Sequence, residues 1–360
     1  MNRIPIVPFP VDAESDPFFA ALSSALLPVL GYRADTPYWC SPRHTYCTHC
    51  GGCSKTGLEK HQLMLYHTLL AISGVAFAFS YPQDDAVPYA TMDAVERGWR
   101  WPDAFLCPLM DALGVRWKRL PHPDADTLCA AVRQSVGRGW PVLAREGQSW
   151  LLLAGFEPDA SGRLLACTYR GGEAILPFPP APDDLLVFEG TGTPALTYES
   201  VLRLLLKTLD HPAHVRLERD LIAALDAVTP ENAQETAAFV KGVIDVHIEA
   251  RWHAAEAFVS CDTPLSRLSN DDALKQTLSD LFFSRYIQNG NGETHSTCWQ
   301  IWALLGVGPD SGYQLAADAS ERIQRPDVRA ALKRLLTVVF DNDRRVSEGI
   351  HAALDQSPAC

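Results

Sequence analysis

The sequence predicts an α+β protein with two domains, a mixed domain over residues 1–192 and an all-helical domain over residues 193–360. Three observations predict this arrangement. The chain has 360 residues, which is long enough to bury two separate cores. Runs with the character of strands end at Gly190, and the later segments all have a helical period. The composition, 47% hydrophobic and 21% charged, is that of an ordinary globular protein.

The predicted N-terminal domain begins with two helices. The first covers Asp16–Leu30, because aspartate is a suitable N-cap and the following proline suits the first helical position. The second covers Ser54–Ile72, and the apolar run Gly74–Phe79 predicts a buried strand or a tight turn. Two later helices, Pro102–Leu113 and Asp126–Gly137, each end at a glycine.

Apolar runs with strand-like alternation predict an antiparallel sheet in this domain, and a proline-rich stretch at Leu176–Asp184 predicts a linker. The predicted strands are Val115–Leu120, Pro141–Arg145, Ser149–Phe156, Arg163–Tyr169 and Leu185–Glu189. In the second domain the helical period predicts helices at Thr197–Leu209, Arg216–Val228, Pro230–Val259, Asp271–Gln288, Thr294–Leu305 and Arg325–Asp341.

A cysteine-rich segment at residues 38–54 carries the strongest chemical signal of the sequence. Its four cysteines have the spacing C-x6-C-x2-C-x2-C. Cysteines two residues apart can turn their sulfurs onto one centre, as in structural zinc sites and iron–sulfur clusters. We therefore predict a metal site, with zinc or an iron–sulfur cluster as cofactor, whose ligands are Cys40, Cys47, Cys50 and Cys53. His44 or His49 is an alternative ligand in place of Cys40, and a redox or nucleophilic thiol or an inert loop are alternatives to a metal site.

Four segments resemble the papain-like fold of C39-like cysteine peptidases, and more closely the acyltransferase family of butirosin biosynthesis. They are Met64–Tyr81, Pro102–Leu120, Gly137–Gly147 and Trp150–Gly172, together about half of the N-terminal domain. The resemblance implies a papain-like α+β domain, with residues 38–54 as an insertion, followed by a helical domain. It also implies a role in bacterial specialised metabolism, with a small molecule or an acyl- or peptidyl-carrier protein as substrate.

The sequence departs from this family at both catalytic positions. The family has a nucleophilic cysteine at the start of the first helix, where this chain has Asp16–Phe19. The family has a general-base histidine at the start of a strand, where this chain has Ser149 and Trp150. Without this pair the usual acyl-transfer route is closed, which implies a degenerate cleft beside the predicted metal site.

Two alternatives to this hypothesis remain open. In the first, Cys53 is the nucleophile of an active acyltransferase or cysteine hydrolase, because Cys50–Ser54 is similar to the C-G-x-C turn that precedes the central papain-like helix. In the second, the domain is a non-catalytic module that binds a peptide or a carrier protein.

Charge and hydropathy restrict the partners. A net charge of −12 without a lysine or arginine block argues against nucleic acid as a partner. No apolar run reaches the length of a membrane span, and the N-terminal segment has no apolar core of the length found in signal peptides, so we expect a cytoplasmic protein that does not insert into membranes. The sequence makes no prediction of the oligomeric state.

The predicted helix Pro230–Val259 carries a crowded polar group. Helical spacing places Asp245, Glu249 and His253 on one face and His247 with Arg251 on another. Carboxylates and histidines on helices can hold a di-iron centre, but this requires a partner helix with the same signature, and the sequence shows none. We therefore interpret the group as a salt-bridged polar face; its members are Asp245, His247, Glu249, Arg251 and His253.

Overall fold

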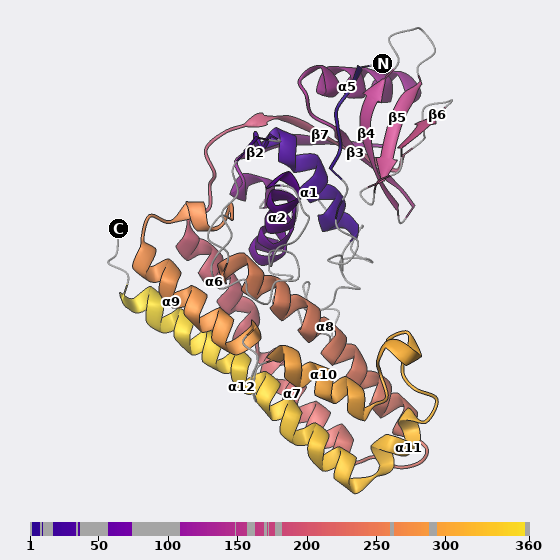
Figure 1. Cartoon of the computed structure of the whole chain (residues 1–360), viewed down its shortest axis with the longest axis vertical. Coiled ribbons are helices and arrows are strands. Elements are labelled where there is room, and N and C mark those ends of the chain that lie inside the picture. The colour runs from indigo at the N-terminus through magenta and orange to yellow at the C-terminus, as the bar shows by residue number, and fades with distance from the viewer. Residues whose placement is uncertain are drawn as a thin grey trace. The chain divides into compact units, whose positions relative to one another are not determined.

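The computed structural model describes residues 2–7, 9, 17–33, 35–36, 57–73, 109–147, 149–156, 163–168, 171, 173–176, 182–259, 263–287 and 294–356. These residues form two compact units, each described here by itself (Figure 1). One unit contains the strands with α1, α5 and most of α2, and the other contains α6 to α12. The chain is therefore mixed, with an antiparallel sheet and many helices, which confirms the predicted α+β class.

The first unit is built on a seven-stranded sheet whose order is β2-β7-β3-β4-β5-β6, with β1 paired to the end of β4. All strand pairs are antiparallel. The strands are β1 (Asn2–Arg3), β2 (Val115–Pro121), β3 (Val142–Glu146), β4 (Ser149–Phe156), β5 (Leu164–Thr168), β6 (Glu173–Leu176) and β7 (Asp184–Thr191). The strand β6 lies just before the predicted linker and was missed by the sequence analysis.

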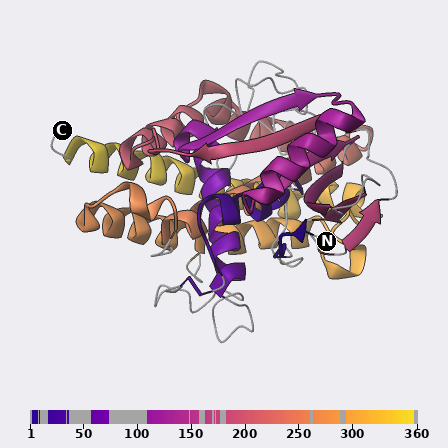
Figure 2. The same cartoon turned by 90° about the horizontal axis from the view of Figure 1, so that it is seen from above.

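Helices cover both faces of this sheet. Strand β4 alternates, so that Leu153 packs with α5 (Ala125–Gly137) in one hydrophobic core. Trp150 points to the opposite face, where its ring lies 5.1 Å from that of Phe18 on α1 (Pro17–Val29). Figure 2 shows α5 along the strands. The helix α2 (Gly57–Ser73) is buried along most of its length, and its Gln62 donates a hydrogen bond to Ser24 of α1 at 2.6 Å.

The second unit is helical, as its hydrophobic period predicts. Its helices are α6 (Tyr198–Leu209), α7 (Pro212–Asp226), α8 (Ala233–Val259), α9 (Asp272–Phe282), α10 (Thr294–Leu304), α11 (Ala319–Gln324) and α12 (Pro326–Gln356). The helices α7, α8, α10 and α12 run side by side in Figure 1 and enclose a core of aliphatic side chains with Trp302 and Phe340. A π-helical turn, Phe283–Ile287, continues α9. None of the helices in the described part of the chain has the length and apolar character that a bilayer crossing requires.

Two helix boundaries differ from the prediction in a way that matters for function. The predicted helix Arg216–Val228 begins at Pro212 in the structure, where His211 is the N-cap and the proline takes the first turn. The predicted helix Arg325–Asp341 continues as α12 to Gln356. Its Gly349 allows a close approach of α9, because a Cβ atom there would lie 2.5 Å from a methyl group of Leu281.

Candidate functional site

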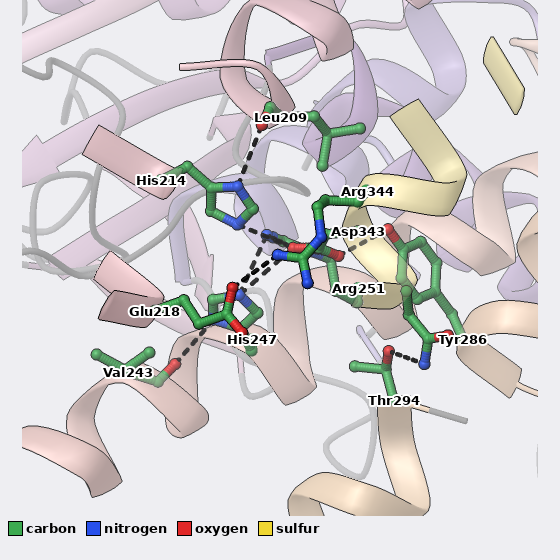
Figure 3. Close-up of polar contacts among 11 residues, drawn as sticks. Leu209, His214, Glu218, Val243, His247, Arg251, Tyr286, Thr294, Asp343 and Arg344 are labelled. Atoms are coloured by element: carbon green, nitrogen blue, oxygen red, sulfur yellow. Dashed lines mark hydrogen bonds and ion pairs between the residues drawn. The ribbon is translucent and has the colours of Figure 1, made fainter. Parts of the chain in front are cut away.

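The core of the helical unit contains a cluster of polar side chains from four elements (Figure 3). His214 lies in the first turn of α7, His247 and Arg251 are one turn apart on α8, and Asp343 lies in the middle of α12. Tyr286 comes from the π-helical turn after α9. All five side chains are buried; Arg251 and Asp343 are each 1% exposed. Long charged residues are almost never buried to this degree unless they are paired.

Asp343 is the centre of this cluster. Arg251 donates from Nε to Oδ1 at 3.0 Å and to Oδ2 at 3.1 Å, and from Nη2 to Oδ2 at 2.7 Å. Tyr286 donates its hydroxyl to Oδ1 at 2.9 Å. Burial by itself raises the pKa of Asp343, but the Arg251 charge and hydrogen bonds from the neighbouring side chains hold that pKa well below its ordinary range. Burial also raises the pKa of Tyr286, so that the phenol keeps its proton and remains a donor. The carboxylate is therefore ionised, and the arginine balances its charge.

The two histidines approach the same carboxylate oxygen. His214 Nε2 lies 3.0 Å and His247 Nε2 lies 3.4 Å from Asp343 Oδ2. Their rings are nearly parallel, with an interplanar angle of 16° and centroids 5.9 Å apart. The three potential ligand atoms all lie within 4.8 Å of one another. Two imidazoles and a carboxylate thus converge on one point.

Backbone carbonyls fix the orientation of both rings. His214 Nδ1 lies 3.1 Å from the carbonyl oxygen of Leu209, at the end of α6, and His247 Nδ1 lies 3.1 Å from that of Val243. The last carbonyls of a helix lack partners within the helix, so His214 also satisfies the end of α6. A carbonyl can only accept, which places a proton on each Nδ1 and directs each Nε2 toward Asp343. Metal-ligating histidines commonly have this second hydrogen bond to a carbonyl.

The surroundings of the two rings differ. Burial and the Arg251 charge lower the pKa of His247 to about 4, so this ring is neutral at pH 7 and its Nε2 presents a lone pair. His214 has acceptor oxygens at both nitrogens, Leu209 O at 3.1 Å and Asp343 Oδ2 at 3.0 Å. A neutral imidazole has a single N–H, so it can donate to only one of these two oxygens.

The polar group on α8 therefore differs from the sequence interpretation. His247, Arg251 and His253 are buried, with exposed fractions of 0%, 1% and 4%, so they are not part of a solvated face. Arg251 is salt-bridged, but to Asp343 on another helix. The sequence did not reveal the partners of His247 and Arg251. These partners are His214 on α7 and Asp343 on α12, not a second helix with the same signature.

The residues predicted for the thiolate site lie outside the described residues, as do the two histidines offered as alternative ligands. The predicted metal site and the predicted nucleophile therefore stay predictions; they involve Cys40, His44, Cys47, His49, Cys50 and Cys53. Within the described residues the cysteines are Cys129, which is half-buried, and Cys167 and Cys298, which are buried. The position matching the family's general base is at the start of β4, where Trp150 packs on α1.

Comparison with known proteins gives no further guide to the site. No protein-family model, no curated protein and no solved structure matches this chain.

Proposed function

We propose that this protein binds a divalent transition-metal ion in its helical unit, through His214 Nε2, His247 Nε2 and Asp343 Oδ2. The observation that carries the proposal is the convergence of these three atoms within 4.8 Å, with both rings oriented by backbone carbonyls. The three residues come from three packed helices, which hold their positions more rigidly than loops do.

The donor set indicates the class of metal. Imidazole and carboxylate ligands suit zinc and iron(II), and two histidines with one carboxylate leave coordination positions open. Open positions are typical of catalytic sites, where water or a substrate completes the coordination. The proposed class is therefore a zinc or non-haem iron centre that activates a bound water or substrate.

Arg251 sets the main cost of binding. Its guanidinium lies 2.7 Å from the proposed ligand oxygen and 3.4 Å from His247 Nε2. A metal ion bound to these two atoms would lie close to the guanidinium, and the two positive charges would repel each other. Arg251 can keep its 3.0 Å bond from Nε to Oδ1 if Oδ2 is given up both by Nη2, now at 2.7 Å, and by Nε, now at 3.1 Å.

Metal titration of variants tests this proposal. Replacing histidine by asparagine keeps a donor near the position of Nδ1 and removes Nε2, so His214→Asn and His247→Asn delete a ligand while the bond to the carbonyl can persist. We expect the stripped wild-type protein to bind one Co²⁺ or Zn²⁺ in the helical unit, and each variant to bind it at least about tenfold more weakly. The matched control is His351→Asn, because His351 is an exposed histidine paired with Asp210 in the same unit. Equal metal affinity in the wild type and both ligand variants would exclude the site.

The spacing of the cysteine-rich segment favours a second metal proposal, which the same titration separates from the first. In this proposal Cys40, Cys47, Cys50 and Cys53 hold zinc or an iron–sulfur cluster beside a degenerate papain-like acyl-transfer cleft. A cytoplasmic location, where thiols remain reduced, suits such a site. Replacing all four cysteines by serine removes this ion and leaves the ion of the helical unit. If Cys53 is instead a nucleophile, iodoacetamide blocks activity or binding of a carrier-linked acyl group.

A further inference from the structure

The sheet unit contains a surface pocket at the C-terminal end of α5, where this helix meets β2 and β7. Its volume is about 340 Å³, within the range of sites for small molecules. The polar residues that line it are Arg116, Lys118, Gln134, Ser135, Arg138 and Glu189.

The pocket is positively charged although the chain as a whole carries a net charge of −12. Three cationic side chains and one carboxylate line it, which leaves a net charge of +2. Lys118 Nζ forms an ion pair with Glu189 Oε1 at 3.2 Å, and Arg138 Nη1 donates to the Glu189 carbonyl oxygen at 3.3 Å. These contacts hold the two cationic groups at the rim on β7.

Local backbone geometry positions the third cation. The register of β2 against β7 shifts between Arg116 and Trp117, and a bulge of this kind re-aims the adjacent side chain. Arg116 then lies over Gly190, where a Cβ atom would be 2.4 Å from Arg116 Nη2. The glycine therefore leaves the space that the guanidinium occupies.

The turn that follows α5 carries Arg138 to the pocket. Ser135, in the last turn of α5, also lines the pocket and is 1% exposed. Its carbonyl oxygen accepts the N–H groups of Arg138 at 2.9 Å and Trp140 at 3.1 Å, which fixes the turn that carries Arg138.

We propose that this pocket binds the phosphate group of a small phosphorylated molecule. A phosphate monoester carries a charge of about −1.5 to −2 at pH 7, which matches the charge of the pocket. One guanidinium group can donate two parallel hydrogen bonds to the oxygens of one phosphate group. The volume leaves room for a small organic group beside the phosphate. This site is independent of the metal ion proposed for the helical unit.

Calorimetric titration of the full chain with phenyl phosphate and with inorganic phosphate tests the proposal, at constant ionic strength set with potassium chloride. Arg116→Gln removes the guanidinium group of Arg116, and Gly190→Ala displaces it. We expect saturable binding to the wild type that is at least about tenfold weaker in Arg116→Gln, because this variant loses hydrogen bonds between charged groups. Gly190→Ala keeps the net charge, so weaker binding in this variant supports the positioned guanidinium.

Arg133→Gln is the matched control, because Arg133 is exposed on the same helix but does not line the pocket. It makes the same change of charge as Arg116→Gln, and we expect unchanged affinity. Absence of saturable binding of both probes to the wild type would overturn the proposal. So would an equal loss in Arg133→Gln and Arg116→Gln, which would indicate only general attraction of an anion to a positive surface.

Discussion

Each unit of this protein buries an aspartate that is paired with arginine, and the two differ in what else they contain. Asp184, at the start of β7, accepts from Arg119 Nε at 2.6 Å and from Arg145 Nη2 at 2.7 Å. Its arginine side chains are 30% and 18% exposed, so both guanidinium groups reach water. Asp343 in the helical unit has a single arginine, which is 1% exposed, and two histidines at the same oxygen.

The difference distinguishes a structural ion pair from a candidate metal site. Arginines that keep contact with water neutralise Asp184 at low desolvation cost, and the pair can join β7 to its neighbours without further groups. The Asp343 cluster is completely desolvated and already has a guanidinium and a phenol as donors. Because Arg251 already balances the charge of the carboxylate, the two oriented imidazoles are not needed for charge balance. They do supply two potential metal ligands.

The largest expected effect on stability follows the removal of the Asp343 charge. Asp343→Asn leaves Arg251 as an unpaired buried cation, and we expect a loss of about 3–5 kcal/mol in the free energy of unfolding, measured by urea denaturation. Asp341→Asn is the control on the same helix. Asp341 pairs with the half-exposed Arg344, so this change should cost less than about 1 kcal/mol. Equal losses in the two variants would show that the buried cluster contributes no special stability.

The next largest effect is the recovery of stability on addition of a metal ion, which we expect at Asp343 and not at Asp184. Arg251→Met leaves Asp343 without its cation and should destabilise the chelated protein by about 3 kcal/mol. Zn²⁺ at about one hundred times its dissociation constant should restore about 2.7 kcal/mol, because the ion binds only the folded cluster. Arg145→Met removes one of the two arginines that pair with Asp184, and we expect no rescue there because no pair of histidine side chains converges on Asp184 among the described residues. Rescue of both variants, or of neither, contradicts the distinction between the clusters.

A smaller effect is expected at Asp184, with a defined pH dependence. Burial raises the pKa of this carboxyl, but the hydrogen bonds and charges of Arg119 and Arg145 outweigh burial and lower that pKa overall. A lowered folded-state pKa stabilises the protein fully above the ordinary carboxyl pKa of about 4, and this contribution is lost as the pH falls through the folded value.

Asp184→Asn should therefore cost about 2 kcal/mol at pH 7, and the difference from the wild type should shrink below about pH 4. Urea denaturation at several pH values measures both. A difference that stays constant down to low pH would mean that the charge of Asp184 contributes nothing.

The smallest effect serves as a baseline for both clusters. Glu199 and Arg203 form an exposed pair one turn apart on α6, with their nearest atoms at 2.7 Å. Arg203→Gln should change the free energy of unfolding by less than about 0.5 kcal/mol, because water and salt screen exposed pairs. A larger change in thermal or urea denaturation would indicate that surface charges contribute more to this fold than the account assumes.

Hydrophobic periodicity predicted most of the described elements, because burial of one face fixes the period of a helix or strand. The strand Ser149–Phe156 agrees with the prediction, and the predicted helix Pro230–Val259 differs at its start by three residues. The strand β6 was missed because it is four residues long and adjoins a proline-rich run, which favours a linker. These helices and strands do not test the papain-like resemblance, which stays a prediction.

The candidate site was only half visible in the sequence. His247 and Arg251 are four residues apart on a recognisable helix, so their shared face could be predicted. His214 precedes the predicted start of its helix, and Asp343 follows the predicted end of its own, because polar residues and Gly349 weaken the apolar period there. The predicted helix to Gln288 also missed the π-helical turn that brings Tyr286 to Asp343; such turns are frequent at functional sites. Contacts between residues so distant in sequence follow from packing and leave no local pattern.

Anomalous X-ray diffraction at the zinc edge, from crystals of the zinc-loaded chain with its four clustered cysteines replaced by serine, tests the central claim most directly. The account predicts a peak about 2.0–2.2 Å from His214 Nε2, His247 Nε2 and one oxygen of Asp343, with Arg251 withdrawn from that oxygen. Zinc-loaded crystals without a peak there, and with Arg251 still bound to both carboxylate oxygens, would contradict the account and leave the cluster as a structural ion pair.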